Sequence, residues 1–180
     1  GILQAGGLLR WGLQHLTAGQ TSRTGPEAPS ASAKPQTLFE KILSRHLLTT
    51  PATPAQPKPG DGVFVEADWR FIHEYYTGMA DTLLQGALGP SITLQRPDHI
   101  VVFEDHTSYV QESPAHVKGG LIPQMQAMNQ AQRDFAAHHR LRFHRTLTDA
   151  EAAKDDGSNQ AGISHAMMTE LYALPGQVVV

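Results

Sequence analysis

Two spacings of hydrophobic positions alternate along residues 37–180. One is helical spacing, which predicts helices over residues 80–88, 123–139 and 165–171. Before, between and after these helical patterns lie short runs rich in β-branched and aromatic side chains, which predict strands over residues 62–67, 99–103, 141–147 and 176–180. Because strands and helices alternate, we expect an α/β fold with a mainly parallel sheet.

A further helix, expected over residues 37–48, carries its own start signal. Thr37 is followed three positions later by Glu40, the arrangement of a capping box, and apolar positions at helical spacing follow. Residues 51–60 cannot continue this helix, because their four prolines remove backbone donors and clash with the preceding turn. The pattern therefore predicts a short helix that is followed by a loop.

Residues 1–36 differ in composition from the rest of the chain. Residues 1–16 contain several leucines and only one charged side chain, Arg10, which predicts a weakly amphipathic helix. Residues 17–36 are rich in Ser, Thr, Gly, Ala and Pro, and such a segment buries too little apolar surface to offset the entropy of ordering. We expect a flexible or accessory extension over residues 1–36 and one domain over residues 37–180. A targeting presequence is the alternative for the first segment.

The charge balance and the absence of cysteine exclude several function classes. The chain has 17 acidic and 14 basic side chains, so nucleic-acid and anionic-membrane binding have no electrostatic support. The lack of cysteine excludes disulfides, thiolate nucleophiles and thiolate ligands for zinc or for an iron–sulfur cluster. No apolar stretch approaches the roughly 20 residues of a membrane span. We expect a soluble protein with neither a membrane nor a nucleic-acid partner.

The first candidate for chemistry is the pair Asp105 and His106, just after the strand predicted over residues 99–103. In open α/β sheets, ligands bind outside the carboxyl ends of the strands. An adjacent carboxylate also stabilises an imidazolium and supports proton transfer. The alternative is that Asp105 caps a turn and that His106 is merely exposed.

The second candidate is His165, which follows Ser164 at the start of a predicted helix. Backbone N–H groups at such a position point toward an anionic ligand. A loop histidine that is satisfied by solvent is the alternative. His73 and Glu74 allow similar alternatives, chemistry at the end of an element or packing of the tyrosines that follow.

A third group of histidines lies in the most basic stretch of the chain and consists of His138, His139 and His144. Their spacing matches none of the familiar metal motifs, so a solvated helix end is the favoured interpretation. The sequence also contains no Gly-rich phosphate loop and no nucleophile-elbow motif, which leaves nucleophilic catalysis without support.

Several segments carry a family resemblance through their order along the chain. They are Thr37-Leu38-Phe39-Glu40-Lys41-Ile42-Leu43, Pro59-Gly60-Asp61, Ile72-His73-Glu74, Pro97-Asp98 with Val101-Val102-Phe103-Glu104-Asp105-His106, and Gly162-Ile163-Ser164-His165 with Leu174-Pro175-Gly176. In this order they resemble the N-terminal domain of the aconitase superfamily, in particular the large subunit of 3-isopropylmalate dehydratase and its homoaconitase-like relatives. The resemblance implies a three-layer α/β/α fold for residues 37–180, present here as an incomplete domain.

The resemblance implies an iron–sulfur hydro-lyase that removes and re-adds water on a hydroxy di- or tricarboxylic acid of the 3-isopropylmalate or aconitate type. The family uses a 4Fe–4S cluster whose iron acts as a Lewis acid. By position, Asp105, His106 and His165 match catalytic residues, and Ser164 and His73 match substrate-binding positions. In the family, the catalytic base is a serine from a separate swivelling domain or small subunit. A cytoplasmic location is implied, with a mitochondrial one as the alternative.

The chain departs from the family pattern in ways that affect the site. No glutamine follows His73 and Glu74, where the family has one in its active site. The chain stops before the family's Gly-Thr-Asp-Ser-His-Thr loop and its three cluster-binding cysteines, so no metal ligand is expected within it. Because the chain starts on Gly1 and stops inside an apolar run, we expect both ends to be cut. Because the family's cluster ligands and catalytic base are missing from it, we expect the chain to be inactive alone.

Two other functions stay open at the level of sequence. One is a cysteine-free zinc or iron site that hydrolyses or hydrates a small substrate, built from Asp105, His106, His138, His139 or His165. The other is a non-catalytic remnant that binds a partner through an apolar edge at residues 177–180.

Overall fold

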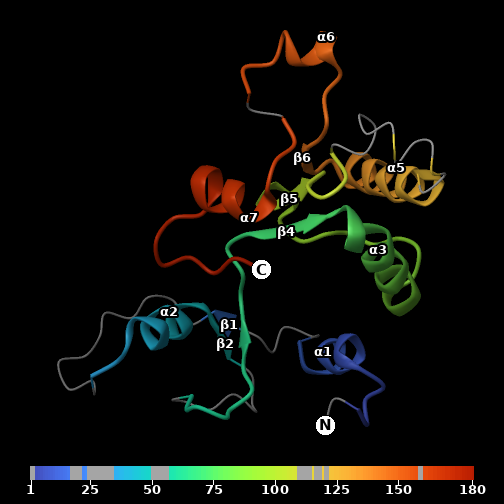
Figure 1. Ribbon diagram of the computed structural model, residues 1–180. Coiled ribbons are helices and arrows are strands. Elements are labelled where there is room, and N and C mark those ends of the chain that lie inside the picture. Colours follow the sequence, from blue (N-terminus) through green and yellow to red (C-terminus); the bar gives the residue numbers. More distant parts are fainter. Residues whose placement is uncertain are drawn as a thin grey trace. The chain divides into compact units, whose positions relative to one another are not determined.

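The computed structural model shows a mixed α/β protein (Figure 1). The residues that it describes are 3–16, 22–23, 35–49, 57–108, 115, 119, 122–157 and 160–180. The chain divides into two compact units. The first consists of Gly1–Asp68 with Gly176–Val178, and the second of Trp69–Pro175 with Val179–Val180.

The first unit contains two helices and an antiparallel sheet. Helix α1 spans Leu8–Leu16, within the segment predicted to be helical, and α2 spans Leu38–His46. Strands β1 (Ser22–Arg23), β2 (Leu47–Thr49) and β3 (Phe64–Val65) pair in the order β1-β2-β3. Most of the predicted linkers lie outside the described residues.

Helix α2 begins with the predicted capping box. The Thr37 hydroxyl accepts a hydrogen bond from the Glu40 N–H at 3.2 Å, and Glu40 Oε2 accepts one from the Thr37 N–H at 2.7 Å. At the other end of the helix, Nε2 of the buried His46 lies 2.6 Å from Asp68 Oδ2. The same carboxylate oxygen accepts a hydrogen bond from the Val178 N–H at 2.8 Å. The side chain of Asp68 thus joins the end of α2 to the C-terminal segment of the first unit.

The second unit is built on a parallel three-stranded sheet. Strands β4 (Arg70–His73), β5 (Ile100–Phe103) and β6 (Arg142–His144) pair in the order β4-β5-β6. In this register His73 lies opposite Phe103, and Phe103 lies opposite His144. The carboxyl ends of all three strands therefore meet at one edge, and the predicted α/β class is confirmed.

Helices connect and flank this sheet (Figure 1). Helix α3 (Glu74–Leu88) leads from β4 toward β5 and packs against α5 (Ile122–His139), which precedes β6. Parallel strands require such crossover connections, because a tight turn cannot join them. The short helix α6 spans Asp149–Ala152, and α7 spans Ser164–Met167 and continues as a π-helical turn over Met168–Tyr172.

Strand β5 is buried along its whole length and has apolar contacts on both faces. One cluster of buried side chains consists of Ile100, Val102, Phe135, Ala136 and Leu141. A second consists of Val101, Phe103 and Met168. Successive side chains of a strand point to opposite faces, so β5 contributes to both clusters and fixes the centre of the sheet.

Several predicted boundaries require correction. The helix predicted over residues 37–48 ends at His46, and Leu47 and Leu48 belong to strand β2. Helix α3 begins at Glu74 rather than at residue 80, because Tyr75, Tyr76 and Gly78 interrupt the helical pattern without interrupting the helix. The strand predicted over residues 176–180 is reduced to an isolated parallel bridge between Val179 and Trp69. Among the described helices, none has the length and apolar character needed to cross a membrane.

Candidate functional site

Polar side chains gather at the edge of the parallel sheet where β4 and β5 end. His73 is the last residue of β4 and Glu74 the first of α3, while Asp105 and His106 follow β5. The pairing of His73 with Phe103 brings the two strand ends side by side. The structure therefore places the predicted Asp105 and His106 beside the predicted His73, at the edge where α/β sheets bind ligands.

Glu74 anchors the loop that carries Asp105 and His106. Its Oε2 accepts a hydrogen bond from the Asp105 N–H at 3.0 Å, and its Oε1 accepts one from the Thr107 N–H at 2.6 Å. The Glu74 residue is only 1% exposed. Because a buried carboxylate is costly without hydrogen bonds, these two contacts stabilise both the carboxylate and the loop. No local sequence pattern marks this role of Glu74, which directly follows the last residue of β4.

Asp105 connects the loop after β5 to the start of α7. Its Oδ2 accepts hydrogen bonds from the Ser164 N–H at 2.9 Å and from the Ser164 hydroxyl at 2.6 Å. Burial raises the pKa of Asp105, but the Ser164 bonds and the charges of His106 and His73 outweigh it, so its pKa lies below the ordinary value. The anion expected at the start of this helix is thus the Asp105 carboxylate itself.

His106 is the most accessible group of the pair, with 42% of its side chain exposed. Its Nδ1 lies 4.0 Å from Asp105 Oδ1, and its ring centroid lies 4.5 Å from that of His73 and 4.9 Å from that of Tyr75. An exposed imidazole beside an ionised carboxylate is suited to donating a proton to a bound ligand.

His73 and His165 belong to the same group of charges. Burial lowers the pKa of His73, and the nearby charges of His106 and His165 lower it further, against the opposing effect of Glu74 and Asp105. The exposed ring of His165 stands edge-on to Phe71 of β4, with centroids 5.3 Å apart. All five residues predicted from the sequence, namely His73, Asp105, His106, Ser164 and His165, therefore converge on this edge.

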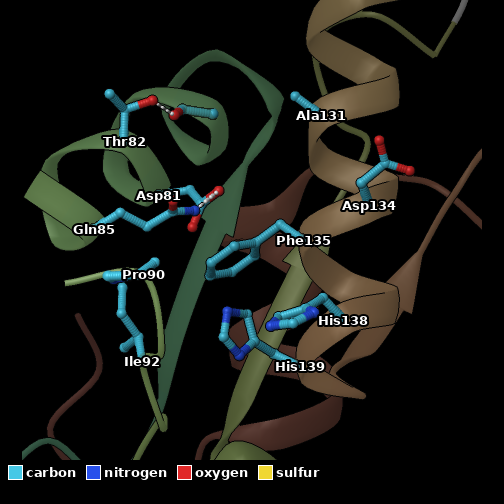
Figure 2. Close-up of a pocket in the computed structure, with 11 residues that line it drawn as sticks. Asp81, Thr82, Gln85, Pro90, Ile92, Ala131, Asp134, Phe135, His138 and His139 are labelled. Carbon is cyan, nitrogen blue, oxygen red and sulfur yellow. Dashed lines mark hydrogen bonds between the residues drawn. The ribbon is translucent and has the colours of Figure 1, made fainter.

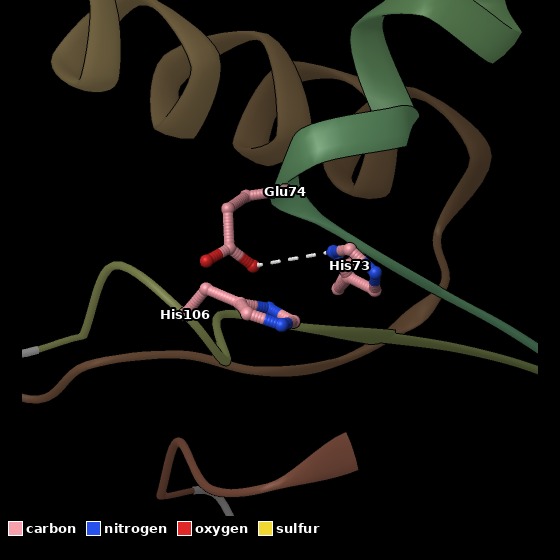
Figure 3. Close-up of side chains that lie close together, drawn as sticks. All are labelled: His73, Glu74 and His106. Atoms are coloured by element: carbon pink, nitrogen blue, oxygen red, sulfur yellow. Dashed lines mark ion pairs between the residues drawn. The ribbon is translucent and has the colours of Figure 1, made fainter. Parts of the chain in front are cut away.

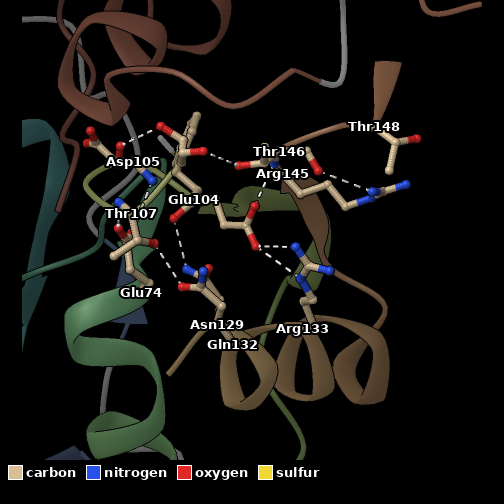
Figure 4. A network of polar contacts seen from close by, with 12 residues as sticks. Glu74, Glu104, Asp105, Thr107, Asn129, Gln132, Arg133, Arg145, Thr146 and Thr148 are labelled. Carbon is tan, nitrogen blue, oxygen red and sulfur yellow. Dashed lines mark hydrogen bonds and ion pairs between the residues drawn. The ribbon is translucent and has the colours of Figure 1, made fainter. Parts of the chain in front are cut away.

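A network of polar contacts holds the residues at the carboxyl end of β5 (Figure 4). Glu104 Oε1 accepts two hydrogen bonds from Arg133 of α5, at 3.0 and 2.7 Å, and its Oε2 accepts one from the Thr146 N–H at 2.5 Å. Gln132 donates to the Phe103 carbonyl at 2.8 Å. These contacts fix the backbone on either side of the predicted site.

His144 has a structural role. It is fully buried at the end of β6, stacks on Phe103 at 5.0 Å, and makes contacts through both ring nitrogens, with the Gln160 carbonyl at 3.2 Å and the Tyr172 hydroxyl at 2.5 Å. Burial lowers its pKa. The favoured sequence interpretation of His144 as part of a solvated stretch is wrong, because the strand buries it.

His138 and His139 lie elsewhere in the second unit. They line a cavity of about 480 Å³ together with Asp81, Gln85 and Phe135 (Figure 2). Because α5 leads into the amino end of β6, these histidines lie at the edge of the sheet opposite to His106. A single metal site therefore does not combine His138 or His139 with His106, as one alternative from the sequence supposed.

A smaller cavity of about 190 Å³ opens beside the candidate site, among residues that follow β5 and β6. It is lined by Ser108, Thr146, Leu147, Ala152, Gln160 and Ala161. Ser108, two residues after His106, thus lines a cavity at the same edge of the sheet.

The histidines and carboxylates of this edge do not fit a 4Fe–4S cluster as a resident group. Such clusters are held by cysteine thiolates, and the chain has no cysteine. Comparison with known proteins adds no family: no family model matches the chain, and no curated protein matches it. The function of the edge is therefore inferred from its own geometry.

Proposed function

We propose that this edge is part of the active site of a hydro-lyase of the aconitase and 3-isopropylmalate dehydratase type. The observation that carries the proposal is the double hydrogen bond between Asp105 and Ser164, which joins two segments 59 positions apart. It places His165 on the same edge as His106. The substrate would be a hydroxy di- or tricarboxylic acid.

His106 would act as the proton donor to the leaving hydroxyl. As the imidazolium, it transfers a proton to that oxygen, the C–O bond breaks with its electron pair, and water departs. A base removes a proton from the neighbouring carbon, and the C–H electron pair forms the C=C bond. Asp105, 4.0 Å from His106, stabilises the imidazolium before the transfer. Rehydration follows the same steps in reverse.

The other residues of the edge would orient the substrate and the dyad. His165 is exposed and bears a ring that can donate a hydrogen bond to a substrate carboxylate. Ser164 is a positioning residue, since both its N–H and its hydroxyl are directed to Asp105. The ring of His73 packs against the ring of His106, with centroids 4.5 Å apart.

The remaining parts of the machinery would come from outside this chain. The base would be a serine of a swivelling domain or small subunit, and the cluster would be held by cysteines of other segments. The proposal includes a three-layer α/β/α arrangement, which the apolar clusters on both faces of β5 support. It also includes a cytoplasmic or mitochondrial location and an inactive isolated chain.

The test is a dehydration assay on the natural protein, complete with the domains or subunit and the cluster that it requires. Loss of 3-isopropylmalate, citrate or malate is followed by the ultraviolet absorbance of the unsaturated product. We expect turnover of at least one of these acids and a fall in kcat on the order of 100-fold in Asp105→Asn. Turnover of none of them, or an unchanged kcat in a folded Asp105→Asn protein, would count against the proposal.

A further inference from the structure

Three groups that commonly ligate metals converge at the junction of β4 and α3. They are His73 Nδ1 or Nε2, the Glu74 carboxylate and a ring nitrogen of His106, and one donor atom of each lies within 4.8 Å of the others (Figure 3). His73 Nδ1 is 4.0 Å from Glu74 Oε2. Two imidazoles and one carboxylate are a ligand set that binds zinc and related divalent metals.

Of the three groups, Glu74 is held by hydrogen bonds and His73 is largely buried. Glu74 is fixed by the N–H groups of Asp105 and Thr107, and each carboxylate oxygen retains a lone pair beyond the one used. The side chain of His73 is only 13% exposed. Outer hydrogen bonds of this kind orient the ligands of known metal sites.

His73 also has a ring nitrogen that makes no hydrogen bond and could bind a metal. Among the described residues, Nδ1 of His73 is buried and has no hydrogen-bond partner. A buried polar atom without a partner is costly, and a bound cation would satisfy it.

The geometry points to a divalent transition-metal site, of the class that zinc occupies, formed by His73, Glu74 and His106 with at least one position open to solvent. Tetrahedral zinc ligands stand about 3.3 Å apart, given metal–ligand distances of about 2.0–2.1 Å. The 4.0 Å separation of His73 and Glu74 therefore needs to shorten by less than about 1 Å. The side chain of His106 is 42% exposed, which leaves this side of the three groups accessible to solvent.

A metal at this position would have a consequence for catalysis, and this consequence rests on the proposed function. A metal-bound His106 nitrogen has given up the lone pair that carries the proton, so it no longer acts as the proton donor. Zinc bound at this position would then inhibit dehydration. Binding of the metal itself does not depend on that function.

The test is titration of the 180-residue chain with zinc chloride by calorimetry, with cobalt(II) absorption as a second readout of ligand geometry. We expect one zinc per chain, and a loss of affinity of at least about 10-fold in His73→Gln and in His106→Gln. The matched control is His138→Gln with His139→Gln, which lie together on α5. This double variant should bind zinc as the parent chain does.

Two results would overturn the inference. One is unchanged zinc affinity in His73→Gln, with its fold verified by circular dichroism. The other is loss of binding in the His138→Gln, His139→Gln variant alone. Glu74 variants are unsuitable as the main test because Glu74 also anchors the loop. Because the titration contains no substrate, a negative result would contradict the metal site but would not test the hydro-lyase proposal, which the dehydration assay tests.

Discussion

The Asp105 carboxylate accepts two hydrogen bonds from Ser164, one from the backbone N–H at 2.9 Å and one from the hydroxyl at 2.6 Å. Both groups of Ser164 thus converge on one oxygen atom, and the side chain of Ser164 is buried. This contact ties the loop after β5 to the first turn of α7. It fixes one oxygen of the Asp105 carboxylate, while the other oxygen, Oδ1, lies 4.0 Å from His106 Nδ1.

Ser164→Ala should weaken this contact and raise the pKa of Asp105. Hydrogen bonds to charged groups contribute about 1.5–3 kcal/mol, and the N–H bond remains, so we expect a loss of about 1–2 kcal/mol at pH 7. The pKa of Asp105 is lowered in the folded protein, so its contribution to stability is present above the unfolded value of 3.8 and is lost as the pH falls. Urea unfolding from pH 7 to pH 3 measures the difference.

The control for this variant is Ser44→Ala, which removes a hydroxyl that donates to the Glu40 carbonyl on an exposed helix surface. The difference between parent and Ser164→Ala should shrink as the pH falls below about 4, whereas the difference for Ser44→Ala should not change. A pH-independent effect of Ser164→Ala would show that the hydroxyl does not act through the ionisation of Asp105.

Glu74→Ala should destabilise the second unit and loosen the loop that carries His106. The change leaves the N–H groups of Asp105 and Thr107 without their acceptor, at a cost of about 1–3 kcal/mol for each buried group. Glu74→Gln retains a carbonyl oxygen and should lose less. Urea unfolding measures the stability, and amide hydrogen exchange of Thr107 measures the loop. Equal stability of Glu74→Ala and the parent chain would contradict this role.

Arg133→Ala should be more damaging than its exposure suggests. Glu104 is buried, and Arg133 supplies two of its hydrogen bonds, so the variant leaves a buried carboxylate without its charge partner. Breaking such pairs costs about 3–5 kcal/mol. Chemical unfolding of the variant provides the measurement.

A second arginine offers a matched comparison for Arg133→Ala. The pair of Arg145 and Glu151 has similar geometry but is partly exposed on both sides, at 35% and 43%. Exposed ion pairs contribute little, so Arg145→Ala should destabilise the protein clearly less. Equal effects of the two variants would mean that burial of Glu104 does not determine the importance of its partner.

The sequence predicted the elements whose signal is local. The run Ile100–Phe103 is a strand because four apolar, mostly β-branched residues stand together, and the capping box at Thr37 forms because both of its partners are three positions apart. Asp105 and His106 were found for a similar reason, since they follow a recognisable strand.

Contacts between distant positions could not be predicted in the same way. Glu74 and Thr107 are 33 positions apart, and no local pattern marks a glutamate that will accept backbone hydrogen bonds from another loop. The sequence does not predict the first turns of α3, because Tyr75 and Gly78 have weak helix propensity. In the structure, packing of α3 against α5 outweighs this weak propensity. The burial of His144 depends on Tyr172 and Phe103, which lie far from it in the sequence, so no local pattern reveals it.

The most direct test of the proposed hydro-lyase function is the kcat of His106→Gln, beside that of His138→Gln, in the natural protein with the partners and cluster that the proposal requires. The account predicts that His106→Gln lowers kcat by about 10²–10⁴-fold with little change in KM, because the proton donor is lost while the substrate contacts remain. His138→Gln, at the opposite edge of the sheet, should behave as the parent enzyme does. A His106→Gln enzyme that retains the parent kcat would contradict the account.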